Sequence, residues 1–374
     1  MALEKPKFGL PSDKGGKDLG IFMPIANGGW IMSKNAPKID ASFEYNKQAA
    51  VLADKLGLDF VMSMAKWRGY GGDIEHWKYS LDAQILMAAI GEATERVKVW
   101  TTVHTFLQNP AVTAKMIATL DHVTGGRSGL NIVTGSYKGE FDQMGAWKEG
   151  IDHDRRYDYA DEWIDCIKRL WMEEGNVSHS GEFFRLEDCE SYPKPLLKPR
   201  PFLVCAGTSP RGMKFASEQA DALFVLGRND EELAQISKDA KAKAAEAGTT
   251  LKTYTMMTLV MEETDEAAQK AEQYYTEGLD EGALKGMLRA YGFLDSEMGK
   301  ENAFVASARS SFMTTRSVGS VERVAERLES LFETTDLDGL MLIFPDYLEG
   351  IPMFTSEILP RLRARFPEKD LTNA

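Results

Sequence analysis

The sequence has few cysteines and no long apolar run. Its three cysteines, Cys166, Cys189 and Cys205, are widely spaced and form no CxxC pair, so neither a disulfide framework nor a thiolate metal site is expected. No early apolar run resembles a signal peptide, and none reaches the roughly 18 residues of a membrane-spanning helix. We therefore expect a cytoplasmic protein that does not associate with membranes.

An excess of positive charge is also absent. The chain carries 44 basic and 57 acidic residues, for a net charge of -13, which argues against a protein that binds the phosphate backbone of nucleic acids. The five histidines show no HxH or HExxH spacing, so no metal site is expected. No GxSxG, Walker or GxGxxG motif occurs where a predicted strand meets a helix. The sequence therefore gives no motif that supports a serine hydrolase, an NTPase or a Rossmann dinucleotide-binding protein.

What the sequence does contain is a regular alternation of apolar strand-like runs and amphipathic helical patterns, without hairpin signals. Its 374 residues, 43% of them hydrophobic, suffice for a large α/β domain. Eight strand–helix units of this kind predict a parallel sheet closed into a (β/α)8 barrel of the TIM type. Strands are expected at residues 19–25, 59–64, 97–103, 127–133, 202–205, 222–226, 253–260 and 339–344.

The domain organisation follows from the same alternation. We expect a flexible arm over residues 1–18, a single barrel domain over 19–366 and a tail over 367–374. Two segments do not fit a barrel unit. Residues 175–201, rich in Pro, Gly and charge, predict a connecting excursion, and residues 280–318 predict an inserted lid or arm over the carboxyl-terminal mouth of the barrel.

Polar side chains gather where the predicted strands end, which is where barrels bind ligands. Asn131 interrupts an otherwise apolar strand, and a buried amide needs partners for its donors and acceptors. It is a candidate ligand contact, with an amide satisfied by neighbouring backbone as the alternative. His104, directly beyond a strand, is the one histidine that we retain as a candidate.

A second set of residues suits a phosphate group. Gly207 and Ser209 open a helix, where free N–H groups and a hydroxyl favour an anion; the alternative is an ordinary N-cap at Ser209 followed by Pro210. Arg155 and Arg156 carry guanidinium groups, which suit bidentate binding of phosphate, and Tyr157 would cover a ring or donate to a phosphate oxygen. A solvated arginine pair with the tyrosine packed in the core is the competing interpretation.

Six segments carry a resemblance to a known family. The chain resembles the bacterial luciferase-like flavin-dependent monooxygenases. Within them it is most similar to the pyrimidine (uracil) monooxygenase group, and dimethylsulfone monooxygenases are more distantly alike. The resemblance implies a (β/α)8 barrel that forms a homodimer or homotetramer, uses O2 as co-substrate and takes reduced FMN from a separate NAD(P)H-dependent flavin reductase. The segments are 24–37, 59–72, 113–135, 138–145, 154–162 and 205–216, with NIVTG (131–135) and RRYDY (155–159) specific for this branch.

The resemblance also implies roles for residues at matching positions. A small dioxygen pocket would lie at the N5 edge of the flavin, where Thr102 and Asn131 would donate hydrogen bonds to an oxygenated flavin. An N5-peroxide and a C4a-hydroperoxide both remain open. The pocket residues are Met62, Thr102, Asn131 and Ile132, and the FMN contacts are Ala65, Lys66, Asn131, Glu140, Arg156, Tyr157 and Ser209.

Two departures from the pyrimidine group bear on the substrate. Ser136 stands where those enzymes have Trp, and residues 208–211 read TSPR where they have QSDA. Loss of an indole opens about 150 to 250 Å² of contact surface, so the expected substrates extend from uracil to other heteroaromatic, organosulfur or halogenated compounds. Two alternatives remain: a deazaflavin (F420)-dependent dehydrogenase of the same fold, and a non-catalytic flavin-binding relative.

Overall fold

Eight parallel strands form the centre of the structure, a computed structural model that describes residues 9–135, 137–294 and 303–369. The strands close into a barrel, because β9 pairs with both β8 and β11 and β11 pairs with β1. The predicted TIM-type barrel is confirmed. In order around the barrel the strands are β1 (Asp18–Phe22), β2 (Phe60–Met62), β3 (Lys98–His104), β4 (Ser128–Val133), β7 (Phe202–Ala206), β8 (Ala222–Phe224), β9 (Lys252–Glu262) and β11 (Gly339–Ile343).

The strands are short apolar runs that are buried on both faces, as expected where helices cover the outside of a parallel sheet. β1, β2 and β11 are buried at every position. Inside the barrel, the rings of Phe60, Trp100, Phe202 and Tyr254 stack with centroids 4.2 to 6.0 Å apart. This aromatic layer fills the barrel below Thr102, so space for a ligand remains toward the carboxyl ends of the strands.

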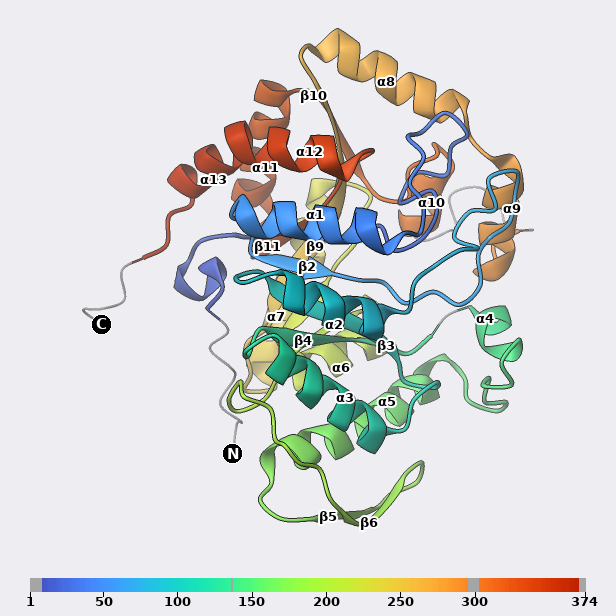
Figure 1. Cartoon of the computed structure of the whole chain (residues 1–374), viewed down its shortest axis with the longest axis vertical. Coiled ribbons are helices and arrows are strands. Elements are labelled where there is room, and N and C mark those ends of the chain that lie inside the picture. Colours follow the sequence, from blue (N-terminus) through green and yellow to red (C-terminus); the bar gives the residue numbers. More distant parts are fainter. Residues whose placement is uncertain (1–8, 136, 295–302, 370–374) are drawn as a thin grey trace.

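Helices surround the barrel, and Figure 1 shows α1, α2 and α3 on the face toward the viewer. They begin where the sequence supplies capping side chains: Ser42, Asn109 and Asp152 each accept a hydrogen bond from a first-turn N–H group. The helices around the barrel are α1 (Phe43–Lys55), α2 (Ala83–Ala93), α3 (Pro110–Val123), α5 (His153–Met172), α6 (Pro210–Gln219), α7 (Asp230–Glu246), α8 (Asp265–Glu277), α11 (Val321–Thr335), α12 (Tyr347–Met353), the π-helical turn η2 (Phe354–Ile358) and α13 (Leu359–Arg365).

Additional elements lie at one end of the barrel. Figure 1 shows α4 (Lys138–Asp142), α9 (Glu281–Ala290) and α10 (Ala303–Ala308) at the right, opposite α13. Asp280 ties α9 to the loop after β2, because its carboxylate accepts the N–H groups of Ile74 and Ala283 at 2.8 and 3.1 Å. Within the segment predicted as a lid, residues 295–302 lie outside the described part. The same segment leads into β10 (Arg316–Ser320), an unpredicted strand that pairs with β9 outside the barrel.

The excursion at residues 175–201 contains an antiparallel pair, β5 (Val177–Ser180) and β6 (Arg185–Cys189). The sequence predicted an excursion here but not the hairpin within it. The two strands read VSHS and RLEDC, too short and polar to show the alternation of a half-buried strand. The hairpin is held by tertiary contacts, since the Glu162 carboxylate accepts the N–H groups of Phe183 and Phe184 at 3.0 and 2.8 Å.

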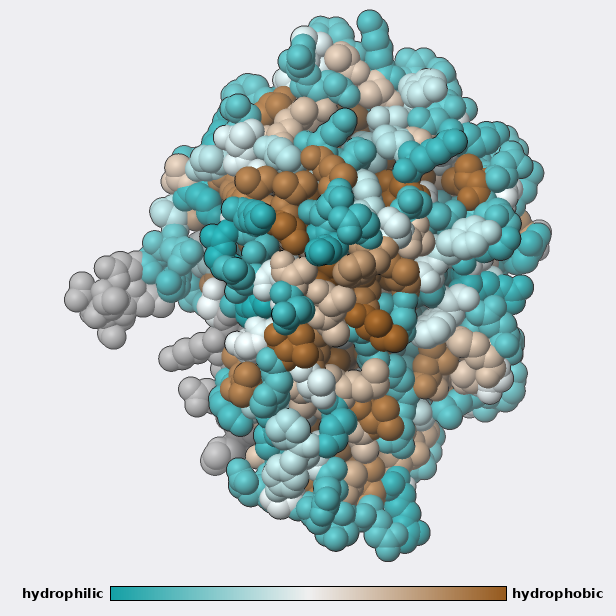
Figure 2. Space-filling model, viewed as in Figure 1, coloured by the Kyte–Doolittle hydropathy of each residue, from teal (hydrophilic) through white to brown (hydrophobic). Residues whose placement is uncertain are grey.

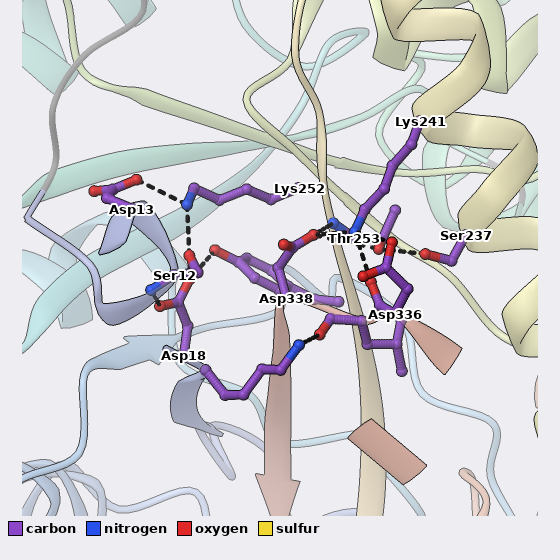
Figure 3. Close-up of polar contacts among 12 residues, drawn as sticks. Ser12, Asp13, Asp18, Ser237, Lys241, Lys252, Thr253, Asp336 and Asp338 are labelled. Carbon is purple, nitrogen blue, oxygen red and sulfur yellow. Dashed lines mark hydrogen bonds and ion pairs between the residues drawn. The ribbon is translucent and has the colours of Figure 1, made fainter. Parts of the chain in front are cut away.

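A polar network closes the amino end of the barrel (Figure 3). The helical turn η1 (Pro11–Lys14) is anchored there, because Asp18 accepts hydrogen bonds from the Ser12 N–H at 2.7 Å and the Tyr254 hydroxyl at 2.6 Å. Burial raises the pKa of Asp18 to about 7. The chain from residue 11 onward thus differs from the flexible arm expected over 1–18. Residues 1–8 of that arm, and 370–374 of the expected tail, lie outside the described part.

Candidate active site

A cavity of about 590 Å³ lies at the carboxyl ends of the barrel strands. Nine of the ten residues predicted for the site line it, although they come from six separate segments of the chain. These nine are Met62, Ala65, Lys66, Thr102, Asn131, Glu140, Arg156, Tyr157 and Ser209.

In the described part of the chain, no group of three or more His, Cys, Asp or Glu side chains is placed to hold a metal ion, and no helix has the length and apolar composition of a membrane span.

Ile132 is the predicted residue that the structure does not bring to the cavity. Asn131 and Val133 line the cavity, and side chains alternate between the two faces of a strand. Ile132 therefore points to the outer face, where it is 1% exposed. Its predicted place around a dioxygen pocket disagrees with this geometry. Ser136, the position that departs from the pyrimidine enzymes, lies outside the described residues.

Asn131 and Thr102 form a hydrogen-bonded pair across neighbouring strands. They stand opposite each other in the register of β3 and β4, and the Asn131 Nδ2 donates to Thr102 Oγ1 at 2.9 Å. The Thr102 hydroxyl in turn donates to the carbonyl of Ser63, so its proton is already engaged. The Asn131 Oδ1 is buried and has no partner among the described residues. Asn131, rather than Thr102, therefore offers unused hydrogen-bonding capacity to a ligand.

Lys66 and Glu140 form a buried ion pair in the cavity wall. The Lys66 Nζ lies 3.4 Å from Glu140 Oε2, and the other carboxylate oxygen accepts the Trp67 N–H at 2.6 Å. The rings of Tyr70 and Tyr137 lie 4.7 and 4.9 Å from the ammonium group. Burial lowers the pKa of Lys66, and the adjacent Glu140 carboxylate opposes that shift. The two residues thus form a fixed, desolvated ion pair after the end of β2.

His104, the last residue of β3, also lines the cavity, as its place directly after a predicted strand suggested. Its Nε2 lies 3.2 Å from the Ala65 carbonyl. Burial lowers the pKa of the imidazole, which favours the neutral ring. Because a carbonyl only accepts, Nε2 carries the proton, and the buried Nδ1 is an acceptor without a partner among the described residues. His104 therefore fixes the carbonyl of a residue predicted to contact the cofactor.

The opposite end of the predicted site suits an anion. Arg156 has no ion-pair partner among the described residues, and its Nε is buried without a hydrogen bond. Ser209 caps α6 by accepting the Gly212 N–H at 3.1 Å, which confirms the N-cap interpretation; of the other first-turn residues, Pro210 has no N–H group and Arg211 has one. A Cβ on Gly207, whose φ is +148°, would lie 2.4 Å from the Tyr157 hydroxyl. Only glycine lets the Tyr157 ring approach this turn.

An apolar wall completes the cavity, and the sequence interpretation had not singled it out. A usable signal existed: Phe22, Phe224 and Met341 fall in or at the ends of predicted strands, on the side of the barrel where ligands bind. The wall residues are Phe22, Trp30, Met64, Trp77, Phe224, Met256, Met341 and Phe304.

Comparison with known proteins decides the family. A family model described as luciferase-like monooxygenase matches residues 18–337. The chain belongs to the luciferase-like monooxygenase family. It is 34% identical over 365 residues to the pyrimidine monooxygenase RutA of Rhizobium rhizogenes, covering 96% of this chain and 99% of that protein. It is 36% identical over 359 residues to RutA of Methylorubrum extorquens, covering 93% and 96%. The protein is thus a flavin-dependent monooxygenase.

Solved structures share the barrel with this family member. Riboflavin lyase RcaE superposes with a TM-score of 0.83 and 21% identity, covering 95% of this chain and 93% of that one. DmoA from Hyphomicrobium sulfonivorans gives 0.80 and 21%, covering 96% and 90%. An F420-dependent secondary alcohol dehydrogenase gives 0.70 and 19%, covering 93% and 99%. At these identities the structures establish a common fold. The cofactor has to be inferred from the residues of the site.

Proposed function

We propose that this family member is the oxygenase of a two-component system. It takes reduced FMN from a separate NAD(P)H-dependent flavin reductase and uses O2 to oxygenate a small heterocyclic, organosulfur or halogenated compound. One observation carries the proposal: the predicted residues line a single cavity in an order that suits FMN. At one end lie the capped helix α6 and Arg156, which has no ion-pair partner among the described residues. The hydrogen-bonded pair of Asn131 and Thr102 lies between that end and Lys66. The pyrimidine monooxygenases among its relatives favour a heterocycle.

The dimensions of the cavity fit FMN. Lys66 follows β2 and Ser209 follows β7, three strands away in the barrel order. At about 4.8 Å per strand the two residues are separated by roughly 14 Å along the sheet, which suits a flat ring joined by a chain to a phosphate. The volume of about 590 Å³ lies in the range of small-molecule sites. Arg156, Tyr157 and Ser209 would hold the phosphate, and Ala65, Lys66, Asn131 and Glu140 the ring.

The residues of this chain have distinct tasks in such a site. Bound reduced FMN supplies the electrons that activate O2. The Asn131 amide, held by Thr102, offers a donor and an acceptor at a fixed place beside the ring. Met62, which is 2% exposed, contributes an apolar surface that excludes water. Phe304 of α10 lines the cavity from the mouth side, so the segment after α9 contributes to the enclosure.

We also propose that the protein is a homo-oligomer whose subunits meet on the face formed by α2 and α3. On these helices Ile85 is 73% exposed, Val112 53% and Val123 40%. Figure 2 shows hydrophobic surface gathered over the centre of this face, in the area of α1, α2 and α3 in Figure 1. Apolar side chains that are exposed together on one face are typical of an interaction site.

An anaerobic titration tests the choice of cofactor. Protein is titrated with reduced FMN and, separately, with a reduced deazaflavin, and binding is followed by absorbance and fluorescence. We expect saturable binding of reduced FMN that Arg156→Gln weakens, with an organic product formed from a panel of uracil, pyridine, sulfone and haloaromatic compounds only after O2 is admitted. Preferential binding of the deazaflavin, with substrate reduced or oxidised in the absence of O2, would establish the dehydrogenase instead.

A further inference from the structure

The side of the cavity opposite the anion end is left for the organic substrate. In the barrel order β1 stands four strands from β7, so the loop after β1 lies across the mouth from Ser209. With FMN extending from β2 to β7, the remaining space is bounded by β9, β11 and β1. Their contributions to the cavity wall, Met256, Met341 and Phe22, are apolar and provide no hydrogen-bonding group to orient a ligand.

Trp30, from the loop after β1, adds a polar group to this apolar part of the wall. Its indole lines the cavity and is 3% exposed. It is held in place by stacking on Phe22, with ring centroids 4.0 Å apart, and by an edge contact with Trp77 at 5.1 Å. Its Nε1 is buried and has no hydrogen-bond partner among the described residues. The indole of Trp77, in contrast, donates to the Gly29 carbonyl at 2.6 Å.

An unpaired indole N–H inside a protein requires an explanation, because most buried donors find an acceptor. Leaving one unsatisfied costs about 1 to 3 kcal/mol. A binding site that waits for its ligand accounts for this cost, since the donor gains its partner when the ligand arrives. The same cost discriminates between ligands, because a compound without an acceptor leaves the N–H unpaired.

We propose that Trp30 is a specificity-determining residue whose indole N–H donates a hydrogen bond to an acceptor atom of the organic substrate. This inference rests on the proposed oxygenase function. It describes the substrate as a compact molecule that is apolar over most of its surface and carries an accessible acceptor, such as a carbonyl or sulfone oxygen. The stacked Phe22 and Trp30 rings form the flat surface against which it packs.

A rival account is that the Trp30 N–H points at the face of Trp77. The two rings meet at 80°, an arrangement compatible with a donor directed at an aromatic face. In that case the N–H stabilises the wall and takes no part in choosing the ligand. The two accounts differ in what removal of the N–H does to ligands with and without an acceptor.

Trp30→Phe makes the comparison directly, because phenylalanine retains an aromatic ring against Phe22 and removes the donor. Binding of 2-pyridone, of dimethyl sulfone and of benzene, which lacks an acceptor of this kind, is measured by calorimetry on FMN-loaded wild type and variant. We expect the Kd of 2-pyridone or dimethyl sulfone to rise about 10- to 100-fold and that of benzene to stay within about twofold. Equal changes for all three probes would overturn the inference, as would wild-type protein that binds neither acceptor-bearing probe.

A spectroscopic readout makes the test independent of turnover. The chain has seven tryptophans, so protein labelled with 15N at the indole nitrogen gives few side-chain signals, and Trp30→Phe assigns one of them. That signal should move downfield with an acceptor-bearing probe and much less with benzene. A signal that stays in place would favour the contact with Trp77. Trp77→Phe is the matched control, because it removes an indole N–H already paired within the protein and should not discriminate between the probes.

Failure of this inference is distinguishable from failure of the proposed function. Titration with reduced FMN is carried out on the same wild-type and Trp30→Phe samples. If neither binds reduced FMN, the oxygenase proposal fails. If both bind it equally and the variant also keeps its affinity for the acceptor-bearing probes, only the role of Trp30 is wrong.

Discussion

Thr102→Val should release the Asn131 amide while leaving the shape of the cavity nearly unchanged. The Thr102 hydroxyl accepts from Asn131 Nδ2 at 2.9 Å and donates to the Ser63 carbonyl, and valine does neither. A buried polar group left unpaired costs about 1 to 3 kcal/mol, so the free energy of unfolding should fall by at least that amount. The amide also loses the contact that orients it. We expect oxygenation to slow by roughly tenfold, equivalent to about 1.4 kcal/mol.

Two measurements separate the structural from the functional effect. Equilibrium unfolding in urea gives the change in stability. With reduced FMN supplied chemically, the ratio of product formed to O2 consumed gives the coupling between oxygen and substrate. Thr102→Ser keeps the hydroxyl and should resemble wild type in both. If Thr102→Val loses stability but keeps the wild-type ratio, the hydroxyl is only a structural contact and the account of the amide is wrong.

Three further predictions concern the cofactor, the amino end of the barrel and the oligomer. Arg156→Gln should weaken FMN binding roughly 10- to 100-fold and leave riboflavin, which lacks the phosphate, within about twofold; equal losses in titrations of both would remove the phosphate role. Because the folded-state pKa of Asp18 is raised from 3.8 to about 7, this group should lower stability as pH rises through that window, by up to about 4 kcal/mol. Asp18→Asn should flatten the dependence in urea unfolding at a series of pH values, and an unchanged slope would contradict the assignment. Ile85→Lys should shift the mass measured by light scattering toward the monomer, and an unchanged mass would place the interface elsewhere.

The barrel was predictable because its strands are apolar runs whose position depends on local sequence. Strands were expected at 97–103 and 127–133 and are found at Lys98–His104 and Ser128–Val133. The elements that were missed are polar. β10 reads RSVGS and, among the described strands, pairs with β9 alone, and the hairpin of β5 and β6 depends on contacts with α5. Tertiary contacts form these elements, and a pattern search along the chain cannot detect such contacts.

The sequence predicted which residues line the site better than it predicted their hydrogen bonds. Residues at the carboxyl ends of strands converge because all parallel strands end on the same side of the barrel, which brought together Lys66, Asn131 and Ser209. The direction of a hydroxyl proton depends on a partner far along the chain. The Thr102 hydroxyl was expected to donate a hydrogen bond to an oxygenated flavin, but in the structure it donates to the Ser63 carbonyl. Trp30 lies within segment 24–37, which resembles the pyrimidine enzymes, but its unpaired N–H is evident only when its surroundings are known.

The central claim is that this cavity binds reduced FMN and directs O2 to an organic substrate. The most direct test mixes anaerobic protein loaded with reduced FMN with 18O2 in the presence of the compound panel, and determines the mass of the product. The account predicts that one 18O atom enters a product whose yield depends on reduced FMN and falls in Asn131→Ala, which should keep the wild-type fold. A product without 18O, or transformation of substrate without O2, would contradict it.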